Sequence, residues 1–216
     1  MSRRQFHARV VLLDWDGTLL NSYAADSRAY LAMFRALEIE WGLAELKCHY
    51  SPDWYQVYRA AKIPRARWPE ANRLWRRAYL AERPRLLPGA RSVVQALGKS
   101  FTLGIVTGGS GDRVRPQLRA FRLADYFAAC VCSEDAPRKK PDPAPLRRAL
   151  QRLRAKPADC VYVGDAPEDI EMARRAGVRS IGVLGPFPTA ERLCRAEPQL
   201  LLKSIRELPL CLRFKP

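Results

Sequence analysis

Short, continuously apolar runs alternate with helical stretches along most of this chain, and no other feature restricts its fold as strongly. The stretches with helical periodicity lie at 112–123, 143–153 and 167–176. Short buried strands that alternate with helices of about 10–15 residues are typical of a parallel sheet with helices on both faces. We therefore predict an α/β fold, a Rossmann-like parallel sheet flanked by helices. The predicted strands are 10–13, 102–107, 128–132, 160–163, 178–183 and 200–202.

The region 21–87 follows a different pattern and is predicted to be an all-helical insert. It holds 11 of the chain's 20 aromatic residues, and several of these recur at helical spacing. The aromatic residues at i, i+7 and i+11 are Tyr23, Tyr30 and Phe34, then Trp68, Trp75 and Tyr79. These side chains form either a platform for a ligand or the core of a small helical unit, and we favour the core. The predicted domains are therefore 1–20 with 88–216 for the α/β part, and 21–87 for the helical insert.

The charge of the chain is strongly basic, with 38 Lys and Arg against 22 Asp and Glu and a formal net charge of +16. Such an excess can indicate binding to nucleic acid. However, the basic residues are spread along the whole sequence, and 30 of the 38 are arginine. A general preference for small anionic substrates is the simpler interpretation, and a non-catalytic, nucleic-acid-associated protein stays as an alternative.

The apolar runs and the cysteines indicate the expected location of the protein. No run approaches the ~18 residues that a membrane span needs. The six cysteines form no CxxC pair, and several lie inside strand-like runs, where a buried thiol behaves as a small hydrophobic group. We therefore expect a reduced, cytoplasmic protein that does not enter the membrane.

Acidic residues follow two of the predicted strands. Asp14 and Asp16 come directly after the first strand, and Asp165 and Asp169 follow the strand at 160–163. The carboxyl ends of parallel strands meet at one edge of a sheet, where ligands bind. Two carboxylates ~4 Å apart repel each other by about 4 kcal/mol at an effective dielectric constant of ~20, so a cation is needed. Hard oxygen ligands in this number favour Mg²⁺.

Two other strand ends carry residues suited to phosphate. Thr107 and Gly108 end one strand and offer a hydroxyl group and an unobstructed backbone N–H, while Lys140 follows another strand with a fixed positive charge. Each segment taken alone has an ordinary interpretation, since Asp-Gly-Thr is usually a turn with a helix cap. Their order, each just after a predicted strand, favours a single site.

These segments resemble the four motifs of the haloacid dehalogenase-like hydrolase superfamily, over residues 10–183. The resemblance implies that Asp14 is a nucleophile that becomes an aspartyl-phosphate. It implies that Asp16 protonates the leaving group and then activates water. Thr107 and Gly108 would bind the transferred phosphoryl group.

The resemblance also assigns the remaining charged residues. Lys140 would neutralise charge on the phosphoryl group and the nucleophile, and Lys139 is its rival for this role. The metal ligands would be Asp14, Asp165, Asp169 and the carbonyl of Asp16. The helical insert and the Leu-Pro-Gly at 87–89 are similar to the subgroup of phosphoglycolate phosphatases and β-phosphoglucomutases, which has a small helical cap.

Asp16 narrows the reaction that the resemblance implies. Haloacid dehalogenases of the superfamily lack an acid at this position, because a halide leaving group needs no proton. The expected function is therefore a Mg²⁺-dependent phosphatase that acts on a small phosphorylated metabolite, with a phosphomutase as the alternative. Phosphoglycolate-like, sugar-phosphate-like and pyrophosphate-like substrates stay open, and so does the choice between monomer and homodimer.

Overall fold

The computed structural model describes residues 5–215 of the 216-residue chain, and these form two compact units. One unit contains the described residues up to Leu20 and those from Leu86 onward, and the other is Asn21–Arg85. Residues 1–4 and 216, which belong to the predicted α/β domain, lie outside the described residues. Strands β3 (Leu20–Asn21) and β4 (Arg85–Leu86) pair where the chain passes from one unit to the other.

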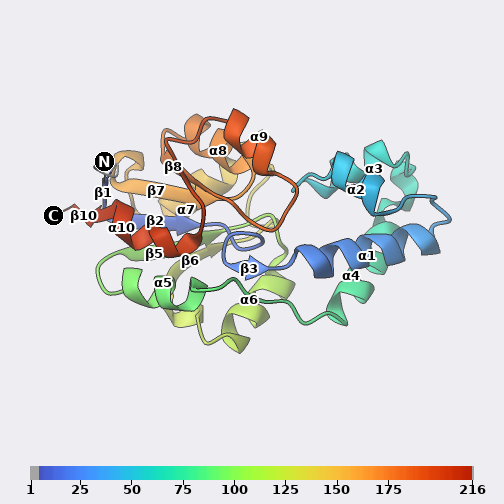
Figure 1. Ribbon diagram of the computed structural model, residues 1–216, viewed down its shortest axis with the longest axis horizontal. Helices are drawn as coiled ribbons and strands as arrows, with labels where there is room; N and C mark the ends of the chain where they lie inside the picture. The colour runs from blue at the N-terminus through green and yellow to red at the C-terminus, as the bar shows by residue number, and fades with distance from the viewer. Residues whose placement is uncertain (1–4, 216) are drawn as a thin grey trace. The chain divides into compact units, whose positions relative to one another are not determined.

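The larger unit is built around a parallel sheet of six strands in the order β6-β5-β2-β7-β8-β9 (Figure 1). Every neighbouring pair in this sheet is parallel. The predicted α/β fold class is therefore confirmed. The strands are β2 (Val10–Leu13), β5 (Thr102–Val106), β6 (Phe127–Val131), β7 (Cys160–Gly164), β8 (Arg179–Val183) and β9 (Leu200–Leu202).

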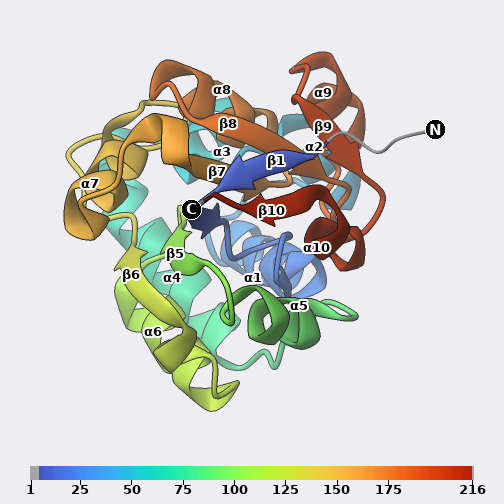
Figure 2. The same ribbon diagram turned by 90° about the vertical axis from the view of Figure 1, so that its left-hand side faces the viewer.

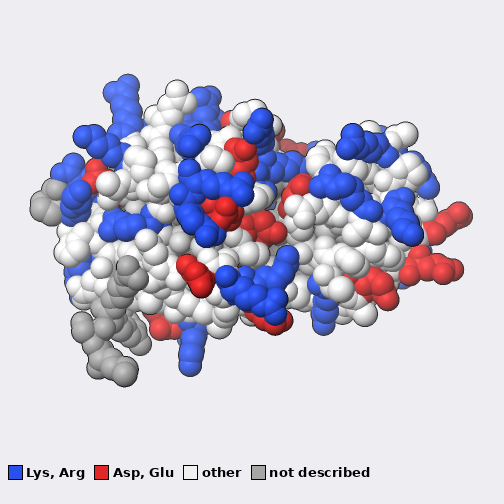
Figure 3. Space-filling view, turned by 90° about the horizontal axis from the view of Figure 1, so that it is seen from above, with Lys and Arg blue, Asp and Glu red and all other residues white. Residues whose placement is uncertain are grey.

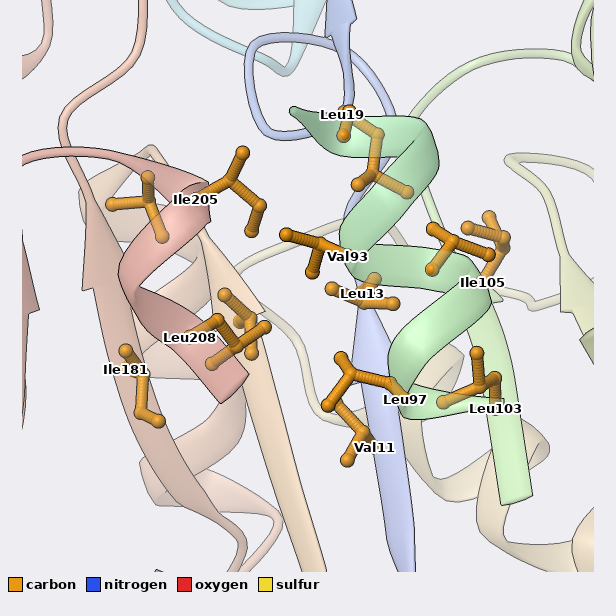
Figure 4. Packing of buried hydrophobic residues seen from close by; sticks show 14 of the residues in the cluster. Val11, Leu13, Leu19, Val93, Leu97, Leu103, Ile105, Ile181, Ile205 and Leu208 are labelled. Atoms are coloured by element: carbon orange, nitrogen blue, oxygen red, sulfur yellow. The ribbon is translucent and has the colours of Figure 1, made fainter. Parts of the chain in front are cut away.

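Helices cover both faces of this sheet, because successive strand residues point to opposite sides and both sides are apolar. On β2, Val11 and Leu13 pack with α5 (Ala90–Leu97), α6 (Gly111–Ala120) and α10 (Leu208–Cys211) in one cluster. Figure 4 shows this face, with Leu13 beneath Val93 of α5. The alternate residues of β2, Val10 and Leu12, pack on the opposite face with α7 (Ala144–Leu153) and α8 (Pro167–Arg175).

Several short elements complete the larger unit and were not predicted. Strands β1 (Phe6–Ala8) and β10 (Leu212–Phe214) form a separate parallel pair near the ends of the chain (Figure 2). The other short elements are α9 (Ala190–Arg195) and the 3-10 turns η2 (Ala124–Tyr126), η3 (Pro157–Asp159) and η4 (Ile205–Glu207). Segments this short with mixed polar and apolar residues carry too little periodicity to be recognised in a sequence.

The smaller unit is helical, and aromatic side chains form its core. Tyr30 and Phe34 are buried together, and the Tyr55 and Trp68 rings stack with their centroids 4.5 Å apart. Packing of this kind gives a short helical segment the apolar contact area that it needs. These aromatics thus serve as the core of a helical unit. The helices are α1 (Tyr23–Ala36), α2 (Leu43–His49), α3 (Trp54–Ala60), the 3-10 turn η1 (Arg65–Arg67) and α4 (Trp68–Leu80).

The surface charges are dispersed. Figure 3 shows Lys and Arg scattered over the drawn face, with Asp and Glu among them. Several arginines are paired locally with acids, as Arg28 is with Glu82 and Arg67 with Glu70. None of the helices within residues 5–215 has the length and apolar composition of a membrane span.

Candidate active site

The site begins at the end of β2, where the chain turns sharply. Asp14 donates its backbone N–H to the carbonyl of Val163 over 2.9 Å, which fixes it between β2 and β7. Gly17 then has a φ of +83°, and a Cβ atom there would lie 2.2 Å from the Asp165 carboxylate. Only glycine allows both this backbone conformation and this close approach. The turn thus brings the loop after β2 against the acidic loop after β7.

Lys140 lies at the centre of the site and is 6% exposed. Its Nζ donates to Asp14 Oδ1 over 2.6 Å, to Asp169 Oδ1 over 2.7 Å and to Tyr162 Oη over 2.7 Å. Burial by itself lowers the pKa of Lys140, but the two carboxylates outweigh it and raise that pKa above its ordinary value. Lys140 is therefore a permanent cation, and of the two rival lysines it is the one that contacts Asp14.

Three buried acids converge around this lysine. Asp14, Asp165 and Asp169 each place a carboxylate oxygen within 4.8 Å of the others. Thr18 Oγ1 donates to Asp165 Oδ1 over 3.2 Å, and the Ala166 N–H donates to Asp169 Oδ2 over 3.1 Å. Three carboxylates beside one ammonium group leave an excess of negative charge away from water.

The pKa values of two of these acids, Asp14 and Asp165, are raised. Burial raises the pKa of Asp14 to about 7; Lys140 opposes that rise and Asp169 adds to it. Burial also raises the pKa of Asp165, with a further contribution from Asp14. A divalent cation would offset such repulsion, and carboxylate oxygens are the ligands that Mg²⁺ prefers. The residues present therefore fit a Mg²⁺ site.

Asp16 faces a different partner. Its carboxylate accepts two hydrogen bonds from Arg113 of α6, at 3.0 Å from Nη1 to Oδ1 and 2.5 Å from Nη2 to Oδ2. Gln117 Oε1 accepts from Arg113 Nη1 over 3.4 Å and from Trp15 Nε1 over 2.9 Å. The side chain of Asp16 is thus held by α6, while the expected metal contact of Asp16 involves its carbonyl and stays a prediction.

Thr107 and Gly108 lie at the end of β5, the neighbour of β2 in the sheet. Thr107 is 2% exposed, and its N–H donates to the carbonyl of Val131 over 3.0 Å. Its hydroxyl oxygen accepts from the N–H of Gly109 over 3.0 Å. The loop is therefore tied to β6 and internally ordered, and the binding of phosphate by Thr107 and Gly108 stays a prediction.

Three residues of the site were not predicted from the sequence. Tyr162 lies in the buried strand β7, so the sequence indicates a core residue. In the structure its hydroxyl group contacts Lys140 and Asp169. A single tyrosine in a buried apolar strand could have indicated a site residue, because a buried phenol needs a hydrogen-bond partner. Thr18 ends the Asp-Gly-Thr segment noted above, but its contact with Asp165 was not predicted, and Arg113 carries no local signal because its partner is defined only by the folded chain.

Comparison with known proteins agrees with this geometry. The sequence model described as Haloacid dehalogenase-like hydrolase matches residues 11–183. This match spans most of the chain, and the chain belongs to the haloacid dehalogenase-like hydrolase family. The resemblance predicted from the four motifs is confirmed.

Among curated relatives, phosphoglycolate phosphatase of Escherichia coli K12 is 32% identical over 124 residues, which cover 57% of this chain and 49% of that protein. The chain thus spans about half the length of that relative. Phosphoglycolate phosphatase of Nitrosospira multiformis is 32% identical over 185 residues, covering 78% of this chain and 80% of the relative. Among solved structures, a putative phosphoglycolate phosphatase from Lactobacillus plantarum superposes with a TM-score of 0.86 at 19% identity, covering 95% of this chain and 100% of that one.

Proposed function

We propose that this chain is a Mg²⁺-dependent phosphatase that hydrolyses a small phosphate monoester through an aspartyl-phosphate on Asp14. The main support for this proposal is the contact of Lys140 with Asp14 and Asp169 inside a buried acidic cluster. Such a cluster pairs a nucleophile with the charges that phosphoryl transfer requires. Phosphoglycolate is the first substrate to test, because the Nitrosospira multiformis relative, which is 32% identical and covers 78% of this chain, is named a phosphoglycolate phosphatase.

The chain's own residues account for both displacements. In the first, an oxygen of Asp14 forms a bond to phosphorus while the bond from phosphorus to the leaving oxygen breaks, and Asp16 gives that oxygen a proton. In the second, Asp16 takes a proton from water, whose oxygen bonds to phosphorus as the bond to Asp14 breaks. The products are the alcohol, inorganic phosphate and the regenerated Asp14 carboxylate.

Charge on the phosphoryl group must be balanced throughout. Lys140 supplies one fixed positive charge, and Thr107 with the N–H of Gly108 supplies hydrogen bonds to the phosphoryl oxygens. When bound, Mg²⁺ adds positive charge beside the same oxygens. The residues expected to hold it are Asp14, Asp165, Asp169 and the carbonyl of Asp16.

Removing the metal is expected to reduce phosphate release to background. The purified protein is incubated with 4-nitrophenyl phosphate and then with phosphoglycolate, with excess EDTA or with Mg²⁺ restored. Because the carboxylates repel one another and the phosphate, we expect a loss of about 10³-fold or more in EDTA and full recovery with Mg²⁺. Turnover that persists in excess EDTA would contradict the proposal, and so would recovery with Ca²⁺ but not with Mg²⁺.

Replacing Arg113 by alanine is expected to lower kcat by about 10- to 100-fold for phosphoglycolate, and by less for 4-nitrophenyl phosphate. Arg113 donates to both oxygens of Asp16, so it stabilises the carboxylate that remains once Asp16 has given its proton to the leaving oxygen, and without Arg113 that proton transfer loses this support. A nitrophenolate leaves with little help from a proton, whereas an alkoxide needs it. The matched control is Arg115→Ala, on the same helix but bound to Asp135. Equal losses of kcat on both substrates would contradict a role of Arg113 in proton transfer to the leaving oxygen.

A further inference from the structure

Two cysteines at the end of β6 lie side by side. Cys130 and Cys132 are two residues apart, so their side chains point to the same face, and their sulfur atoms are 3.6 Å apart. Both are free thiols. Cys132 is 1% exposed, whereas Cys130 is only partly buried. Cys130 is therefore the more exposed residue of the pair, and its thiol is in contact with that of Cys132.

Two arginines and one carboxylate lie close to Cys130. Arg152 donates to the backbone carbonyl of Cys130 over 2.8 Å, and both Arg152 and Arg115 bind the carboxylate of Asp135. The contact with Cys132 lowers the pKa of Cys130, helped by Arg115 and Arg152 and opposed by burial and by the Asp135 carboxylate. The pKa of Cys132 is raised, by the same contact and by burial. Reactive cysteines are typically found beside arginines in partly exposed positions.

We propose that Cys130 and Cys132 are a peroxide-sensitive dithiol that closes to a disulfide. The sulfur of Cys130 attacks a hydroperoxide, so that an S–O bond forms, the O–O bond breaks and the leaving oxygen departs as water or an alcohol. The sulfur of Cys132 then attacks Cys130, so that the S–S bond forms and the S–O bond breaks with release of water. The two thiols lose two electrons, which the hydroperoxide accepts.

The position of the pair links its oxidation to the phosphate-binding loop. Val131, between the two cysteines, accepts the N–H of Thr107 over 3.0 Å, and the N–H of Ser133 donates to Gly109 over 3.0 Å. Residues two apart on a strand have Cα atoms about 6.4–6.8 Å apart, at the upper limit for a disulfide. Closing the bridge therefore shortens the strand end that anchors this loop. Resting on the proposed function, we expect oxidation to reduce phosphatase activity.

The chemical test does not depend on activity. The full chain with Cys48→Ser and Cys194→Ser, which removes the exposed thiols, is treated with one equivalent of hydrogen peroxide, alkylated and digested with trypsin. The peptide 123–138 contains both cysteines of the pair and no others. We expect this peptide to be lighter by two hydrogens and to resist alkylation until it is reduced. A peptide that still carries two alkylated thiols, or one over-oxidised cysteine, would overturn the proposal.

Single variants assign the two roles. In Cys132→Ser, Cys130 is expected to stop at the sulfenic acid, which dimedone traps, and in Cys130→Ser the trapping should be lost. Trapping at Cys132 instead would overturn the assignment. Activity is followed separately in the doubly substituted background, where we expect a loss of at least about fivefold on oxidation and recovery with dithiothreitol. A disulfide without a change in activity would refute the link to the loop, whereas a reduced protein without phosphatase activity would refute the proposed function alone.

Discussion

Replacing Asp14 by asparagine is expected to abolish phosphate release, with a loss of at least about 10³-fold in kcat for every phosphate ester tested. Asparagine keeps the shape of the side chain but removes the negatively charged oxygen that attacks phosphorus. It also places an amide where Lys140 Nζ now has a carboxylate partner 2.6 Å away. The measurement is the initial rate of phosphate release at saturating Mg²⁺, with circular dichroism to confirm that the variant is folded.

The control for this experiment is Asp125→Asn, which changes an exposed acid on η2 in the same way. We expect that variant to keep the activity of the original protein. A second readout is covalent: the original protein, quenched in acid during turnover, should carry phosphate on the peptide with Asp14, and Asp14→Asn should carry none. Undiminished turnover in Asp14→Asn would refute the aspartyl-phosphate mechanism whatever the substrate.

The strands of the large sheet could be predicted closely from the sequence because most of their residues are apolar and the central strand β2 is buried on both faces. Strands β2 and β9 have the predicted bounds, β5 ends one residue before its predicted end, and β9 was recognised by its run of three leucines although it is partly exposed. Burial on both faces produces a continuous apolar run, which differs from the periodicity of the adjoining helices. The pair of β1 and β10 lacks that signal, since each strand has a polar residue, His7 or Arg213, at its centre.

The charged groups of the site were predictable for a topological reason. In a parallel sheet, any residue just after a strand lies at the same edge, so the four acids after β2 and β7 were expected to meet. The structure brings Asp14, Asp165 and Asp169 together, with Lys140 among them, whereas the side chain of Asp16 binds Arg113. The contact of Arg113 with Asp16 joins residues 97 positions apart through a helix face, and no local pattern encodes it.

Lys140→Met is the second variant with a large expected effect, because it removes the cation that separates the buried acids. Loss of one partner of a buried ion pair typically costs about 3–5 kcal/mol, and here Lys140 has two carboxylate partners. For a chain of this size each kcal/mol lowers Tm by about 2–4 °C, so Tm should fall by about 6–20 °C in EDTA. Methionine keeps most of the side-chain volume, which separates the loss of charge from a packing defect.

The same variant gives a test of the metal site that does not depend on catalysis. With Lys140 gone, the repulsion among Asp14, Asp165 and Asp169 is offset only by a bound cation, so Mg²⁺ should raise the Tm of Lys140→Met more than that of the original protein. Calorimetry in EDTA and over a Mg²⁺ series measures this difference, with the exposed Lys156→Met as the matched control. An equal Mg²⁺ effect on Lys140→Met and the original protein would mean that the metal and the lysine do not share these carboxylates. In that case the charge balance proposed for phosphoryl transfer would have to be abandoned, even if Asp14→Asn proved inactive.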